Sequence, residues 1–444
     1  MSAARNVLTP GGCLLVLAVA GGCYSPPAYQ EGDYLYFQDR PREILTVYAP
    51  AEQDHEANAL VGIDKMLSAA LLAGDWGQAE KYAELASSRV NIFLAGEKGE
   101  RDALSLLGQE KKKAFKGEPH ERAMVDFYLG LLRYRRGEYE GALNAFLSAM
   151  AKDRGVYKLP VEKRNAKREG DNAETVIYSS DYATFAFLAA NCCQHIDEPE
   201  EAARYLGEAK SIRPEMAPLF DRGMDPASNV LMVIEGGRAP YKVQTGERGA
   251  VLGYRRAGGA DVRSVRVSGK DAAFGKTDDL YAQATTLGSR AVDDLNRTKA
   301  TRQDALKAAG FATAVAGGVI AVVGNANRNR NLEAAGLIGV GVGVATLIIA
   351  ETAIDPSADI RAWSTLPEDL YLAVGYAPPG EATVEINAGG DYGNDQSQRW
   401  TNVPIESGRT TLLWFRLLPS RRGGVYPSEG TNSANPQAVS GKES

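Results

Sequence analysis

The segment over residues 126–153 constrains the fold of this chain more strongly than any other. It reads DFYLGLLRYRRGEYEGALNAFLSAMAKD, with apolar side chains at helical spacing on both sides of a glycine-containing turn. Small residues stand where two helices would cross, and bulky residues stand between them. Because residues three or four positions apart share one face of a helix, this pattern predicts two helices that fold back on each other and approach closely.

Seven positions carry this pattern. Leu129 and Gly130 are expected to allow the close approach on the first helix. Gly137 and Tyr139 are expected to form the turn and its aromatic plug. The inward stripe of the second helix would consist of Ala142, Phe146 and Ala149. The arrangement strongly resembles a tetratricopeptide repeat, although the closing proline of that motif is absent.

Two weaker copies of the pattern flank this unit, in residues 66–86 and 182–214, with turns at Gly74 and Asp197. The three turns are roughly 60 residues apart, whereas a tandem array repeats every ~34 residues. We therefore predict a short, irregular helical solenoid over residues 53–220. Its concave groove would bind a peptide or a helix of a partner. The alternative is that the units serve only as a packing module.

After residue 220 the pattern changes to short, β-branched segments separated by glycines, which are typical of strands. The expected strands are residues 229–235, 241–244, 250–254, 262–267, 369–376, 381–387, 399–405 and 410–418. We predict that the strands of residues 221–300 pair with those of residues 356–419 in one β-rich, sandwich-like domain. A helix is also expected over residues 278–308. The predicted fold class is α+β.

Residues 301–355 separate the two strand groups and contain two uncharged apolar stretches, 308–324 and 334–350. Small residues recur at every fourth position, namely Gly310, Ala314, Gly318, Ala335, Gly339 and Gly343. This spacing lets two helix backbones touch, so it predicts a tight helical hairpin. Two settings remain open: burial against the β-rich domain or other copies of the chain, or direct contact with lipid. Each stretch is slightly short for the ~30 Å hydrocarbon core.

Residues 1–22 predict an export signal, with Arg5 before a short apolar core and small residues before Cys23. The apolar run is too short to span a bilayer, which needs ~20 residues. The pattern resembles the bacterial lipobox, with Ala20 where that motif usually has leucine, and implies lipid attachment at the Cys23 thiol. The alternative is ordinary signal cleavage after Ala20, which would leave a soluble protein with a free thiol.

Two further segments are predicted to lack a core of their own. Residues 23–52 are expected to form a lipid-anchored tether, because four prolines interrupt them and no period persists. Residues 420–444 are polar and are predicted to be disordered.

Composition and motifs argue against nucleic-acid binding and catalysis. The net charge is −6, whereas a phosphate-binding surface needs excess lysine and arginine. The chain has no nucleophile elbow in a strand-turn-helix context and no phosphate-binding loop of the Gly-Lys type. We predict no enzyme, no cofactor and no metal site, although His195 lies close to Cys193. Cys192 and Cys193 are expected to fill a helix interface, and the pairs at 200–201 and 278–279 to be solvated carboxylates.

Three segments resemble a group of largely uncharacterised bacterial lipoproteins with tetratricopeptide repeats. They are residues 116–122 (KGEPHER), 229–242 (NVLMVIEGGRAPYK) and 358–367 (ADIRAWSTLP). The resemblance covers most of the mature chain and implies an envelope lipoprotein, but no activity.

These observations predict a lipid-anchored cell-envelope scaffold whose repeats bind a protein or peptide partner and which can form a homo-oligomer. The periplasmic face of the outer membrane is preferred, because Tyr24 after Cys23 is not the aspartate associated with inner-membrane retention. The alternative function is a component of an export or pore-forming assembly whose glycine-rich hairpin inserts or oligomerises in the membrane.

Overall fold

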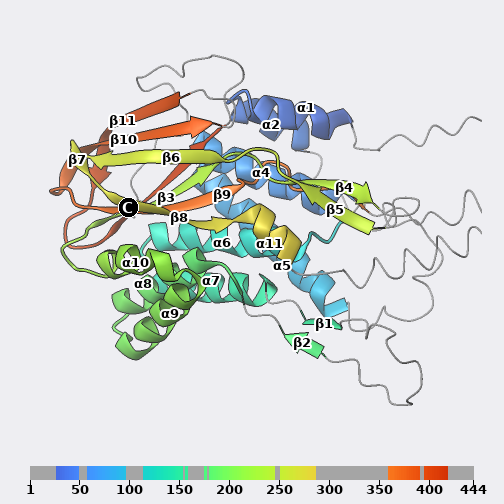
Figure 1. The fold of residues 1–444 in the computed structure, drawn as a ribbon. Helices are drawn as coiled ribbons and strands as arrows, with labels where there is room; N and C mark the ends of the chain where they lie inside the picture. The colour runs from blue at the N-terminus through green and yellow to red at the C-terminus, as the bar shows by residue number, and fades with distance from the viewer. Residues whose placement is uncertain are drawn as a thin grey trace, which may run out of the picture.

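The computed structural model has an α+β fold in which helices cover one face of a pair of stacked sheets (Figure 1). It describes residues 27–49, 58–96, 114–153, 156–158, 175–177, 180–245, 251–286, 359–390 and 395–418. Cys23, the predicted hairpin at 301–355 and the C-terminal tail at 420–444 lie outside the described residues.

Within the described part of the chain, three helix pairs form one layer. They are α4 (Ala59–Ala73) with α5 (Trp76–Gly96), α6 (Pro119–Arg135) with α7 (Tyr139–Asp153), and α8 (Ala183–His195) with α9 (Pro199–Ile212). A short turn folds each pair back on itself, through Gly74, Gly137 and Asp197, whose φ angles are 70°, 77° and 60°. These left-handed conformations suit glycine and tolerate aspartate. They are the three turns that the sequence predicts.

The segment expected to be a tether instead forms two helices that join the core. They are α1 (Pro27–Tyr36) and α2 (Pro41–Tyr48). Tyr36, Ile44 and Tyr48 are all at most 2% exposed. The tether prediction is therefore wrong for residues 27–49. Its error lies in treating the prolines as helix breakers, whereas proline is favourable in the first helical turn, where its missing N–H is not needed.

The described strands form two four-stranded sheets and two short hairpins. The first sheet has the order β12–β3–β9–β8, and the second has the order β11–β10–β6–β7. The first sheet consists of β12 (Thr411–Leu417), β3 (Val230–Gly236), β9 (Asp369–Gly375) and β8 (Ala273–Asp279). The second consists of β11 (Asp395–Ile405), β10 (Gly380–Gly390), β6 (Ala260–Val267) and β7 (Lys270–Asp271). Two further strand pairs are β1 (Val156–Lys158) with β2 (Thr175–Ile177) and β4 (Tyr241–Thr245) with β5 (Val251–Arg255). The remaining helical elements are a 3₁₀ turn (Pro214–Met216), α10 (Ala217–Gly223) and α11 (Leu280–Thr286).

Strands from both sides of the inserted segment pair with each other, as the sequence predicts. β3 is antiparallel to β9 and parallel to β12, while β10 is antiparallel to β6. The sequence pattern does not predict β8, since it places residues 278 and 279 in the helix over 278–308. That helix begins at Leu280, after β8 has paired along β9.

The first sheet is buried on both faces. Along β3, Leu231 and Val233 pack with the helices, while Val230, Met232 and Ile234 pack against the second sheet. A strand that alternates between two cores needs apolar side chains at every position. This explains the uninterrupted run VLMVI in β3 and gives the molecule three layers, helices, sheet and sheet (Figure 1).

We expect Gly130→Ala to destabilise the fold by about 1–3 kcal/mol, because a Cβ there would lie 2.5 Å from Phe146 Cε1 in a filled core. The matched control is Gly207→Ala in α9, where a Cβ meets nothing within 4 Å. Alanine there should stabilise by about 0.5–1 kcal/mol through its helix propensity. Urea unfolding measures both. Equal effects of the two substitutions would contradict the close approach.

Candidate functional site

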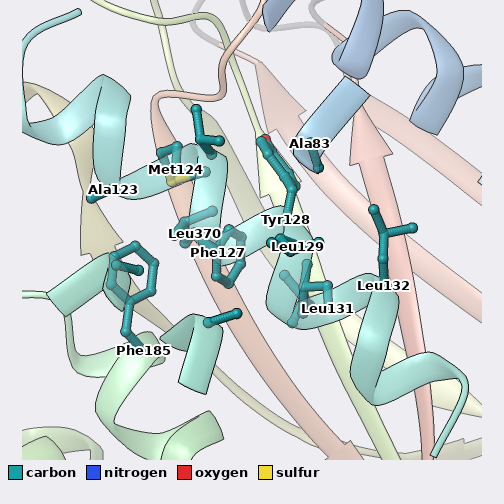
Figure 2. Close-up of a cluster of buried hydrophobic side chains, with 14 of the residues drawn as sticks. Ala83, Ala123, Met124, Phe127, Tyr128, Leu129, Leu131, Leu132, Phe185 and Leu370 are labelled. Atoms are coloured by element: carbon teal, nitrogen blue, oxygen red, sulfur yellow. The ribbon is translucent and has the colours of Figure 1, made fainter. Parts of the chain in front are cut away.

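The first helix of each pair lies between the second helices and the sheet. Fourteen of the fifteen residues of α4 are buried, and α8 is buried from Ala183 to Cys193. Figure 2 shows Leu370 of β9 beside Met124 and Phe127 of α6, with Phe185 of α8 next to them. The Phe127 and Phe185 rings stack with centroids 5.0 Å apart. The inner face of the helical layer is therefore covered by the protein's own sheet.

An open groove lies on the other side of the helical layer, between α5 and α6. Its volume is about 540 Å³. Its lining consists of Glu84, Ser87, Ser88, Asn91, Ile92, Leu129 and Arg133. Ile92 is 66% exposed, which is unusual for a large apolar side chain. Arg133 lies 3.7 Å from Glu84, so both signs of charge border the apolar centre.

A buried ion pair holds the three helices around this groove. Lys152 Nζ of α7 lies 2.6 Å from the Asp126 carboxylate of α6, and their side chains are 5% and 2% exposed. Ser87 of α5 donates a hydrogen bond of 2.7 Å to the same carboxylate, and Ser148 of α7 donates another. Because the buried charge is paired and hydrogen-bonded, it can fix the position of these helices. Ser87, which lines the groove, is thereby tied to α6 and α7.

The seven residues of the predicted repeat signature all lie in the α6–α7 pair and the turn between its helices. Gly130 lies against Phe146, and Gly137 makes the turn. Leu129 is 6% exposed, and it also lines the groove. The three stripe residues, each 0% exposed, are Ala142, Phe146 and Ala149. The predicted hairpin residues, Gly310, Ala314, Gly318, Ala335, Gly339 and Gly343, and the predicted lipid site, Cys23, lie outside the described residues.

Tyr139 stacks on His195, with ring centroids 4.1 Å apart. His195 Nε2 lies 3.0 Å from the hydroxyl of Tyr134, which also donates a hydrogen bond to Asn191. Burial, with the charge of Arg409, lowers the pKa of His195 below its ordinary value, so the ring is neutral near pH 7. His195 therefore packs between two helix pairs as an aromatic side chain.

The cysteine pair is free and buried, as expected for residues that fill a helix interface. In the part of the chain that the structure describes, no three His, Cys, Asp or Glu side chains converge into a metal-binding arrangement. None of the described helices combines the length and the apolar character that crossing a bilayer requires.

Residues 359–368 form a buried strap between the helical layer and the sheet. Trp363 is 1% exposed, and its indole N–H donates a hydrogen bond of 2.8 Å to Ser68 of α4. Its backbone N–H donates a hydrogen bond of 2.8 Å to Glu121 Oε1 of α6. Thr365 also donates to Ser68, at 2.9 Å. The strap thereby ties two first helices to the start of β9.

Glu121 is the centre of this contact. Its Oε2 accepts hydrogen bonds of 2.7 Å from both Lys242 Nζ and the backbone N–H of Glu118, which closes a capping box at the start of α6. Burial alone would raise the pKa of Glu121, but the Lys242 ammonium and these hydrogen bonds hold it below its ordinary value. Lys242 also donates to the backbone oxygen of Arg361 at 2.8 Å. The carboxylate is therefore charged and fully engaged.

The pair at 278–279 is not a solvated face, contrary to the prediction. Asp278 is 0% exposed, and its carboxylate accepts hydrogen bonds from the backbone N–H groups of Ala183 (2.7 Å) and Thr184 (3.1 Å). It thus satisfies donors that the first turn of α8 leaves without helical partners. Glu200 and Glu201 are exposed, as predicted.

Two buried carboxylates at this end of α8 have raised pKa values. Burial, with the nearby Asp181 charge, raises the pKa of Asp153 to about 7. Burial raises the pKa of Asp278 to about 6, against the effect of its hydrogen bonds to Thr184. Asp153 Oδ2 accepts a hydrogen bond of 2.9 Å from Ser180, whereas no hydrogen-bond partner reaches its Oδ1. Both groups hold protons at a pH where an exposed aspartate does not.

Neither the groove nor the strap is evident from the sequence. The groove joins α5 and α6, which belong to different helix pairs, and its lining residues form no local motif. In the sequence, the strap is distinguished only as part of a family resemblance. Its Trp363 is followed by Ser364 and Thr365, and this combination is a signal of a buried, hydrogen-bonded segment. Comparison of the whole chain with protein-family models and with curated proteins found no match.

We expect Glu121→Gln to destabilise the protein by ~3–5 kcal/mol, because it leaves the buried Lys242 charge without its partner. Adding Lys242→Met should recover part of this loss. The control is Glu138→Gln, since Glu138 makes an exposed ion pair with Arg136 and should matter by less than ~1 kcal/mol. Urea unfolding gives the comparison. A small effect at Glu121 would contradict the central role of this carboxylate.

We expect stability to rise as the pH falls from 8 to 5. The folded protein takes up protons on Asp153 and Asp278 near pH 7 and 6, whereas the unfolded chain does so near pH 4, so protonation favours the folded state in this window. The gain is complete below about pH 4 for these groups and is lost as the pH rises through 7. Asp153→Asn should remove on the order of 3 kcal/mol of this pH dependence. Glu200→Gln, at an exposed position, should leave it unchanged.

Proposed function

We propose that this protein is a lipid-anchored scaffold of the bacterial cell envelope that binds a protein partner through tetratricopeptide-like helical repeats. The observation that carries the proposal is the groove between α5 and α6, where Ile92 is exposed and Ser87 is hydrogen-bonded to the buried Asp126–Lys152 ion pair. A rigid apolar depression bordered by charge is typical of a surface that receives a partner's side chains.

The geometry of the helix pairs supports the repeat-like assignment. The three turns share a left-handed residue, and the signature positions of α6 and α7 meet at a glycine–phenylalanine contact. The layer is an irregular solenoid of three such units. In this protein the inner face of the solenoid carries the sheet, so the outer groove is the partner site. The occupant is a helix or a peptide with an apolar side chain for the Ile92 region and polar groups for Glu84 and Arg133.

The envelope location rests on the first 23 residues of the sequence. A positive start, a short apolar run and small residues before Cys23 suit export followed by lipid attachment. Tyr24 favours the periplasmic face of the outer membrane. A scaffold needs no catalytic group, and the buried carboxylates of Asp278 and Glu121 are engaged in a helix cap and an ion pair and do not line the groove.

The alternative is a component of an export or pore-forming assembly whose glycine-rich hairpin inserts or oligomerises in the membrane. It draws on the spacing of Gly310, Ala314 and Gly318 and of Ala335, Gly339 and Gly343. The scaffold is preferred because the groove belongs to the described core, and the groove by itself implies no membrane insertion.

The test is site-specific photocrosslinking in cells. A photoreactive residue at Ser88, inside the groove, should capture one discrete partner, whereas the same residue at Glu200, exposed on α9, should not. Ile92→Glu should lower capture through Ser88 at least ten-fold, which corresponds to ~1.4 kcal/mol. Capture that is equal at both positions, or unchanged by Ile92→Glu, would remove the groove as the partner site.

The lipid anchor is tested in the same cells by fatty-acid labelling and membrane fractionation. Cys23→Ser should abolish the label and release the protein from the outer-membrane fraction. Cys13→Ser, within the predicted signal, is the matched control and should leave both unchanged. An unlabelled wild-type protein would exclude lipid attachment.

A further inference from the structure

The helical layer has two different ends. At one end, called the turn pole, the short turns at Gly74, Gly137 and Asp197 close the three helix pairs. Because the helices of a pair are antiparallel, the first helix begins and the second helix ends at the opposite end of the layer. This connector pole is defined by Asn58, Glu118 and Tyr182, which precede α4, α6 and α8, and by the end of α7 at Asp153.

The chain also enters and leaves the β-rich part at the connector pole. The guanidinium of Arg361, near the start of the strap, donates a hydrogen bond of 3.0 Å to the side chain of Asn58. Lys242 of β4 lies 4.0 Å from Glu118, which places hairpin β4–β5 beside the start of α6. In Figure 1 this hairpin projects to the right, away from the stacked sheets.

The segment before the strap ends at the same pole. α11 packs against β5 and α6, and its Gln283 donates a hydrogen bond of 3.1 Å to the backbone oxygen of Asp181, just before α8. The two points where residues 287–358 join the described structure, Thr286 and Asp359, therefore both lie at the connector pole.

The N-terminal helix points to this pole as well. The Tyr36 hydroxyl accepts a 3.4 Å hydrogen bond from Arg416 in the sheet, while Asp33 receives one of 2.5 Å from Ser364 in the strap. Followed from β9 back to Arg361, the strap leads from the sheet to Asn58 at the connector pole. Followed from Tyr36 back to Asp33, α1 leads in the same direction. Pro27, at the start of α1, consequently lies at the connector pole.

We propose that the connector pole faces a phospholipid bilayer and that the turn pole points away from it. This inference rests on the proposed lipid attachment at Cys23. Cys23 precedes Pro27 by four residues, and an extended chain spans at most ~3.6 Å per residue, so Pro27 lies within about 14 Å of the membrane surface. If another side of the protein faced the bilayer, the four residues from Cys23 to Pro27 would have to pass around the molecule, and they are too short to do so.

One further observation agrees with this orientation. Tyr241 of β4, next to Lys242 at this pole, is 48% exposed. Tyrosine is favoured at the level of lipid headgroups, where its ring is buried and its hydroxyl hydrated.

The experiment uses the full lipidated protein bound to vesicles of phosphatidylethanolamine and phosphatidylglycerol. An environment-sensitive thiol label is attached to Gln244→Cys, exposed near the tip of β4, or to Ser407→Cys. Ser407 is exposed at the turn pole, two residues before Arg409, whose guanidinium lies beside Gly137. The wild-type chain corrects for labelling of the buried Cys192 and Cys193.

A nitroxide carried on the lipid should quench the label at position 244 at least two-fold more than the label at 407, and a water-soluble quencher should show the reverse order. If the protein binds the vesicles but the two labels respond equally, or 407 responds more, the orientation is overturned. If the fatty-acylated form is absent and no vesicle binding occurs, the proposed anchor fails instead. The two failures are therefore distinct.

Discussion

The Glu121 carboxylate is the contact on which the arrangement of the layers depends. It receives Lys242 from the β4–β5 hairpin, the Trp363 N–H from the strap and the Glu118 N–H from its own helix. Burying two charges is costly, and the cost is offset only when each is paired and hydrogen-bonded, as here. Because the strap leads directly into β9, the centre of the first sheet is positioned relative to α4 and α6 by this contact.

The sheet covers the first helix of each pair, so the second helices form the outer side of the helical layer. The inner face of this layer packs against β3 and β9 in a continuous core. The groove between α5 and α6 lies on the outer side, and Ser87 of its lining is hydrogen-bonded to Asp126, which pairs with Lys152. The core that the helices share with the sheet therefore fixes the helices that border the groove.

Local patterns predicted the features that local forces decide. The left-handed turn at Gly137 and the contact of Gly130 with Phe146 follow from the small size and free backbone of glycine. The pairing of the two strand groups joins distant residues, but it was predictable because each group contains β-branched runs that need partner strands. Side-chain contacts between distant residues could not be predicted from local patterns. Asp278, for example, caps a helix that begins 95 residues earlier in the chain. The helices α1 and α2 were missed because their prolines occupy first turns, which no period distinguishes from a tether.

The strand pairing also explains how the fold tolerates a long insertion. Strands β8 and β9, which precede and follow residues 287–358, are hydrogen-bonded neighbours, so the two ends of the inserted segment are brought together by the sheet. Loop-closure entropy grows only slowly with length, so such an insertion costs little once its ends are held together. The ends are held by α11 on one side and by the strap, through Glu121, on the other. Both points of attachment are therefore fixed to the helical layer by contacts of the described residues.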